Sequence, residues 1–165
     1  MRKFALPAAF ILFLLTSGFD YEPGSNYEPV FMMRSELEKG IRLEGARPVE
    51  NPGKIYLKDN LIFINEKYLG IHVIDNTDPR EPENFAFIRV DGCIDMALKD
   101  NVLYADNAVD LVSISLSPQM TGIEVTSRIK DIFPEPSAPD GRELTIREKN
   151  ARPEDAILVK WRLKH

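Results

Sequence analysis

Cysteine is nearly absent from this sequence. Cys93 is the single cysteine among 165 residues, so one chain can form no internal disulfide. One thiol also cannot supply the ligands of an iron–sulfur cluster or a cysteine-based zinc site. Histidine is almost as scarce, with only His72 and His165. The sequence contains neither the Gly-x-Ser-x-Gly spacing of a hydrolase nucleophile nor the spacing of an EF-hand. We therefore predict no catalytic, metal-binding or cofactor-binding residues.

Positive charge is also in short supply. Lysine and arginine total 21 against 26 acidic residues, which gives a formal net charge of −5. Nucleic-acid binding needs a basic patch, and docking on anionic lipid needs clustered cations. Neither kind of partner is expected. The length suits one domain that can bury enough apolar surface to fold alone.

The N-terminus has the three parts of an export signal. Arg2 and Lys3 precede an apolar run over residues 4–15, and small residues follow at 16–18. A run of this length is too short to span a bilayer of roughly 30 Å. The pattern therefore predicts a cleavable signal peptide over 1–18, and a protein exported to the periplasm or cell surface.

Residues 14–18 also look like the approach to a bacterial lipoprotein cleavage site. Such a site needs a cysteine next, because its thiol carries the lipid, but Phe19 stands there. We expect no lipidation, and no strong membrane association after signal cleavage.

Residues 19–52 are predicted to form a linker and one short helix. The linker contains a Pro-Gly-Ser tract. Ser35 and Glu38 match a capping box at the start of the helix, and Gly40 is a natural stop.

An internal repeat occupies residues 53–133. Lys58-Asp59-Asn60 recurs 41 positions later as Lys99-Asp100-Asn101, so the copies span 53–91 and 92–133. Each copy holds four apolar runs that are too short for helices. These predicted strands are 54–58, 61–65, 70–75 and 85–90, then 94–98, 102–106, 109–115 and 123–129. Four strands per 40 residues or so is the period of a propeller blade. The sequence thus predicts an all-β fold with two four-stranded antiparallel, propeller-blade-like units, a partial β-propeller, and one short N-terminal helix.

The first copy resembles the LVIVD repeat of bacterial exported β-propeller-like proteins. The likeness rests on residues 61–64 and on Gly70-Ile71-His72-Val73-Ile74-Asp75, followed by a turn that ends at Pro79. The second copy departs from the pattern, with Asp110 for the glycine and Ser115 for the aspartate. The resemblance covers about half the chain and implies a blade-like fold. It brings no catalytic residues with it.

The tail, 134–165, is rich in proline and holds one or two expected strands, at 145–146 and 156–161. Two blades leave open sheet edges, which invite pairing with another chain. Three expectations follow: the tail covers this flank, the protein self-associates, or the chain is a fragment of a longer propeller. If the tail is the cover, strand alternation places Ile157, Val159 and Trp161 on one face, packed against the last strand of the second copy.

The remaining candidates are weighed against ordinary structural roles. Four aspartates, Asp75, Asp95, Asp106 and Asp110, would form a hydrolase site only if they converged in one cleft. The turn at 75–78 has calcium-ligand chemistry, but a strand-ending turn needs the same residues.

Two aromatic residues beside charges, Tyr68 and Trp161, are predicted to line a shallow binding face. Cys93 is expected to be a buried, inert thiol. We predict a non-catalytic cell-envelope binding or scaffold module, whose partner is an unknown envelope protein or glycan. The alternative is a carboxylate-dependent hydrolase on a propeller-like face.

Overall fold

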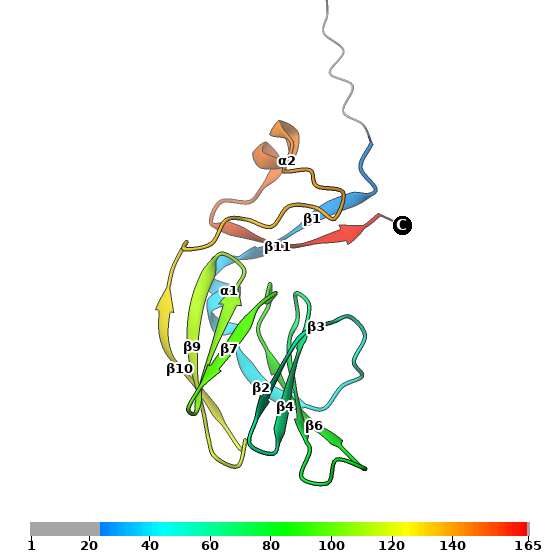
Figure 1. Ribbon diagram of the computed structural model, residues 1–165. Coiled ribbons are helices and arrows are strands. Elements are labelled where there is room, and N and C mark those ends of the chain that lie inside the picture. Colours follow the sequence, from blue (N-terminus) through cyan, green and yellow to red (C-terminus); the bar gives the residue numbers. More distant parts are fainter. Residues whose placement is uncertain (1–23, 165) are drawn as a thin grey trace, which may run out of the picture.

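The computed structural model describes residues 24–164, so the predicted signal peptide and Phe19 lie outside the described residues. The described part of the chain is all-β apart from two short helices, and none of its sheets closes into a barrel (Figure 1). The elements are β1 (Tyr27–Met33), α1 (Arg34–Lys39), β2 (Arg42–Gly45), β3 (Pro52–Lys58), β4 (Leu61–Glu66), β5 (Gly70–Asp75), β6 (Glu83–Arg89), β7 (Met96–Lys99), β8 (Val102–Asn107), β9 (Asp110–Leu116), β10 (Ile123–Ile129), α2 (Ile146–Ala151) and β11 (Ala156–Leu163).

Each copy of the repeat forms an antiparallel sheet of four consecutive strands, as predicted. Blade one, β3 to β6, gains a fifth strand because β2 pairs with β6, and blade two consists of β7 to β10. The predicted tight turns are present. Asp59 and Asp100 have φ values of 51° and 53°, a left-handed conformation that short Asx side chains tolerate.

The two sheets pack face to face over one apolar core, which neither sheet could bury alone. The fully buried side chains come from both blades: Phe63, Ile71, Val73, Ile88, Leu103, Val112 and Ile114. In Figure 1 the blades stand side by side below the β1–β11 ribbon.

The two copies turn opposite faces toward this core. Phe63 points into the core, but its repeat equivalent, Tyr104, lies between the core residues Leu103 and Ala105. Because side chains alternate along a strand, Tyr104 points away from the core. Conversely, Leu103 of blade two lies in the core, but its repeat equivalent in blade one, Ile62, points away from the core. Successive blades of a propeller stack in this way, each with one face toward its neighbour on either side.

The segment predicted as a linker holds more regular structure than expected, since it contains β1 and β2. The predicted helix is present as α1 and ends at Gly40, but the predicted capping box is wrong. Met33 is the N-cap residue, and its side chain makes no capping hydrogen bond. Ser35 lies inside the helix instead. The fully buried Leu37 fixes α1 by packing with Ala108 and Val159.

The tail folds differently from the prediction. Thr145 and Ile146 do not form a strand. Thr145 is the N-cap of α2, and it forms a complete capping box with Glu148, the motif that the sequence reasoning placed at the other helix.

The last predicted strand exists as β11, but it pairs with β1 rather than with a blade. It therefore does not cover the flank at β10, where Val125 and Ile129 stay 39% and 51% exposed. The expected common face of Ile157, Val159 and Trp161 is also wrong. The pairing register shifts opposite Val159, and such a bulge reverses the alternation of side chains. Ile157 and Val159 pack with α1, whereas Trp161 packs on the other side of the ribbon.

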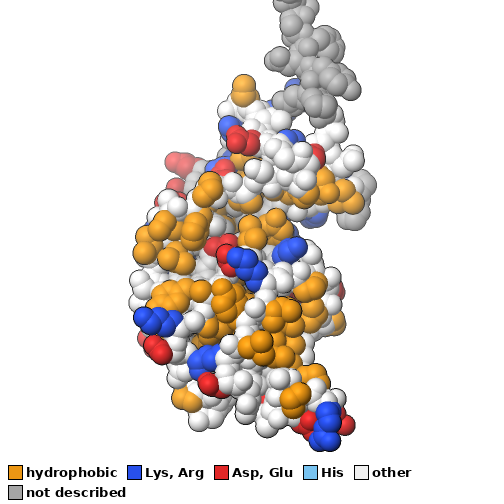
Figure 2. All heavy atoms as spheres, viewed as in Figure 1, with side chains coloured by type: hydrophobic (Ala, Val, Ile, Leu, Met, Phe, Trp, Pro, Cys, Tyr) orange, Lys and Arg blue, Asp and Glu red, His pale blue; other side chains and the backbone are white. Residues whose placement is uncertain are grey.

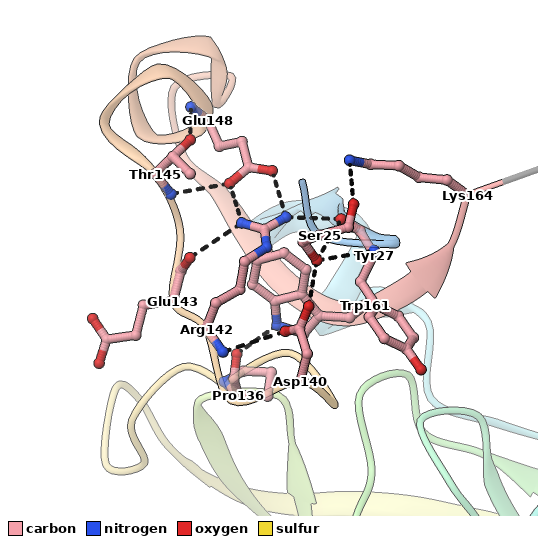
Figure 3. A network of polar contacts seen from close by, with 10 residues as sticks. All are labelled: Ser25, Tyr27, Pro136, Asp140, Arg142, Glu143, Thr145, Glu148, Trp161 and Lys164. Atoms are coloured by element: carbon pink, nitrogen blue, oxygen red, sulfur yellow. Dashed lines mark hydrogen bonds and ion pairs between the residues drawn. The ribbon is translucent and has the colours of Figure 1, made fainter. Parts of the chain in front are cut away.

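A polar network around Arg142 holds the tail to the first described residues (Figure 3). The Arg142 guanidinium bonds to Glu148 at 2.7 and 2.9 Å and donates to the carbonyl of Tyr27. It also lies over the Trp161 ring, 4.5 Å from the centroid. Ser25 donates to Asp140 at 2.6 Å. The bonds from Arg142 to Tyr27 and from Ser25 to Asp140 each join residues 115 positions apart, and so tie the tail to the start of the β1–β11 ribbon.

Candidate functional site

A pocket of about 640 Å³ lies where blade two meets the segment that leaves β10. Its apolar walls come from Tyr56, Met96, Tyr104, Leu111 and Phe133, and its acidic residues are Asp95, Asp106 and Glu135. In Figure 2 the region between the β1–β11 ribbon and the blades carries hydrophobic side chains beside acidic and basic ones. The volume and the mostly apolar lining are typical of small-molecule sites.

Asp106 is the best-defined polar group of this pocket. Near the end of β8, its Oδ1 accepts hydrogen bonds of 2.8 Å from the backbone N–H groups of Ile94 and Asp95. Burial raises the pKa of Asp106, although these backbone bonds oppose the shift. A carboxyl group with a raised pKa in a mostly apolar pocket is typical of functional sites.

Two neighbours complete the polar end of the pocket. The carboxylate of Asp95 pairs with Lys54 of β3 at 2.5 Å, and both side chains are more than half exposed. Cys93 is fully buried, as predicted. Burial and the nearby Asp106 raise the pKa of this thiol well above its usual value, which keeps it protonated and unreactive.

The four aspartates do not converge in one cleft. Only Asp95 and Asp106 line the pocket. Asp75 lies in a separate hollow between the two blades, beside the β9–β10 turn. Asp110 is fully buried, where it serves a structural ion cluster rather than a reaction.

Asp110 is the centre of that ion cluster. It accepts hydrogen bonds from Arg34 at 3.1 Å, from Arg128 at 2.6 Å and from the backbone N–H of Asp131 at 3.0 Å. Burial disfavours the charged carboxylate, but these three donors outweigh burial and lower its pKa. The cluster ties α1 to blade two, and it explains why the repeat has Asp110 where the first copy has Gly70.

His72 also has a structural position. It is fully buried, and its Nε2 lies 3.0 Å from a carboxylate oxygen of the equally buried Glu66. Glu66 accepts two further hydrogen bonds from the backbone N–H groups of Glu50 and Asn51. The His72 ring packs edge-on against Phe87, with centroids 4.9 Å apart. His72 is therefore a buried strand residue held by Glu66 through Nε2, and its Nδ1 has no hydrogen-bond partner within residues 24–164.

The predicted binding face of Tyr68 and Trp161 needs correction. Trp161 is only 7% exposed, because its ring packs on Leu144 and Leu158 and its indole N–H donates to the carbonyl of Pro136 at 2.7 Å. It can offer little surface to a ligand. Tyr68 is half-buried in the β4–β5 turn, with a φ of 66°. Neither side chain lines the pocket.

The turn after β5 is held by its own hydrogen bonds. Asp75 accepts from the backbone N–H of Thr77 at 2.8 Å, and Asp78 pairs with Arg80 at 2.7 Å. Within residues 24–164, no group of three or more acidic, histidine or cysteine side chains is placed to hold a metal ion. No helix in this same range is long and apolar enough to cross a membrane.

Sequence reasoning identified Asp95 and Asp106 as candidates but missed the rest of the pocket. One signal was available: Tyr104 aligns with Phe63, and the two cannot both point into one shared core. A scan of protein-family models and searches of curated proteins and of solved structures find no match to this chain.

Proposed function

We propose that this protein is an exported, non-catalytic binding module of the LVIVD-repeat type, and that the pocket over blade two is its ligand site. One observation carries the proposal. The pocket combines a volume of about 640 Å³, two tyrosine walls and Asp106, a carboxyl group whose pKa is raised by burial. Export rests on the sequence of residues 1–18.

The lining indicates the chemistry of the ligand. Tyr56 and Tyr104 offer aromatic surface, which packs against an apolar face and carries a hydroxyl for hydrogen bonding. Asp95 and Glu135 offer acceptors at the same pocket. A ligand that fits has an apolar face and several O–H or N–H donors, a class that includes fragments of envelope glycans.

A matched pair of variants tests the pocket. Phe133 lines it and is 38% exposed, whereas the adjacent Ile132 is 49% exposed and does not line it. Protein incubated with a low-mass extract of the native envelope would be examined by native mass spectrometry. We expect a bound mass on wild type and on Ile132→Arg, and none on Phe133→Arg. Equal loading of all three proteins would contradict the proposal.

A hydrolase is the second candidate, because Asp95 and Asp106 share this pocket. A carboxyl group with a raised pKa beside a second carboxylate is the arrangement of a general acid and its partner. Activity on a panel of chromogenic glycosides, lost in Asp106→Asn, would favour the hydrolase. Binding that survives Asp106→Asn, without turnover by wild type, would favour the binding module.

A further inference from the structure

Blade one leaves an apolar sheet face uncovered. Its outer face carries two rows that run across the strands: Leu57–Ile62–Ile74 and Ile55–Ile64–His72. Leu57 and Ile55 are 71% and 60% exposed. Figure 2 shows hydrophobic side chains gathered where β3 and β4 lie in Figure 1. The rows themselves carry no lysine, arginine, aspartate or glutamate.

Within residues 24–164, the chain covers only one end of this face. Arg47 lies over the Phe87 ring, 4.9 Å from its centroid, and Asn84 donates to the carbonyl of Arg47. This covers the end at β5 and β6, where His72 is fully buried. The end at β3 and β4 stays open, unlike the polar outer face that normally caps a repeat array.

The second copy of the repeat shows what kind of surface packs against this face. The row Leu57–Ile62–Ile74 of blade one corresponds to the row Leu98–Leu103–Ile114 of blade two, which has the same register. In blade two this row lies in the core, packed against blade one. The open face is therefore the equivalent of a face that another blade covers inside the same molecule.

The face of blade one that covers blade two also has an equivalent in blade two, and that equivalent face lies outside the core. Within the chain, the core row of blade one is Tyr56–Phe63–Val73. Its counterpart in blade two is Ala97–Tyr104–Ser113, which points away from the core and is not buried. Each molecule thus exposes one face of each kind, at opposite ends of its two-blade stack, and neither row brings a charge into the contact.

We infer that a second copy of this chain covers blade one, and that its Ala97–Tyr104–Ser113 face packs on the Leu57–Ile62–Ile74 face of the first. The contact is head-to-tail, so further copies can add until a ring closes or a filament grows. The surface proposed for self-association is thus a sheet face, whereas the sequence suggested the open sheet edges. Three strands about 4.8 Å apart make a smaller contact than the roughly 800 Å² per partner of a standard interface. We expect micromolar association.

Sedimentation velocity on the protein purified from expressing cells tests the contact, because exposed apolar positions can be substituted in a controlled way. The protein concentration would run from about 1 to about 300 μM, a range that brackets micromolar affinity. Wild type should form larger species as its concentration rises. Leu57→Lys should stay monomeric. Ile146→Lys on α2, which replaces a 79% exposed isoleucine away from both faces, should behave as wild type. Ser113→Lys, on the second face, should also stay monomeric; Ser115→Lys replaces it if circular dichroism shows misfolding.

Mixing the two monomeric variants is decisive for the head-to-tail geometry. Each retains one intact face, and these two faces are complementary, so the mixture should form a 1:1 heterodimer and nothing larger. A wild type that stays monomeric throughout would overturn the inference. So would a mixture that stays monomeric, because the faces would then not be partners. Ala97 and Tyr104 also line the pocket. Phe133, however, belongs only to the pocket, and Leu57 belongs only to the face between copies. The proposed ligand site and the proposed self-association can therefore fail separately.

Discussion

Trp161 is a buried aromatic anchor of the β1–β11 ribbon. The ring is 93% buried, the indole N–H donates to Pro136, and Arg142 lies over the ring. Replacing a buried tryptophan by alanine costs about 3–5 kcal/mol. Unfolding entropy near 2.1 cal/mol/K per residue gives roughly 0.3 kcal/mol/K for the 141 residues from 24 to 164. Trp161→Ala should therefore lower Tm by about 10–17 °C if the protein unfolds in one step.

Calorimetry together with far-ultraviolet circular dichroism measures this change. Trp161→Phe is the first control, since it keeps a buried ring and loses the N–H bond, so about 1 kcal/mol or roughly 3 °C is expected. Ile146→Ala is the second, and its exposed side chain predicts a change within about 0.5 kcal/mol. A Trp161→Ala protein that melts within about 2 °C of wild type would refute the reasoning. A separate early transition would show that the ribbon unfolds before the blades.

Four further predictions follow from the charged groups and the N-terminus. Asp110→Asn leaves two arginines without their carboxylate and should cost about 3–5 kcal/mol by urea denaturation. The pKa of Glu148 is lowered to about 2, chiefly by its bond with Arg142. The ionised Glu148 therefore adds at most about 3 kcal/mol to the free energy of unfolding above pH 4.5, and this stabilisation is lost as the pH falls toward 2. Urea denaturation across this pH range should show the loss in wild type but not in Glu148→Gln. The pKa of Asp106 is raised, so its contribution has the opposite sign: Asp106→Asn should be at least as stable as wild type at pH 7, and this difference should vanish below pH 4 or so. Intact mass of periplasmic protein should show cleavage near residue 18, and labelled palmitate should enter Phe19→Cys but not wild type.

The blades could be predicted because their signals are local. Short apolar runs and the paired Lys-Asp-Asn turns give strands and hairpins directly, and the repeat gives their grouping. The helix caps were harder, because Ser35 and Thr145 are both followed by glutamate three residues later, and only tertiary contacts decide which one caps a helix.

What the sequence could not predict depends on distant contacts. The pairing of β1 with β11 joins the two ends of the described chain, and no local pattern encodes it. The bulge at Val159 reversed the assignment of Trp161. Asp106 and Asp110 look alike in sequence, but one lines a pocket and the other neutralises two arginines. That difference arises from the neighbours that folding supplies.

Hydrogen exchange tests the proposed binding site most directly. Peptides of the protein would be followed by mass spectrometry with and without the low-mass envelope extract. The account predicts slower exchange at residues 94–97, 104–108 and 133–137, which surround the pocket, and unchanged exchange at β5 and β6. Protection confined to other segments, with the pocket peptides unchanged, would contradict it.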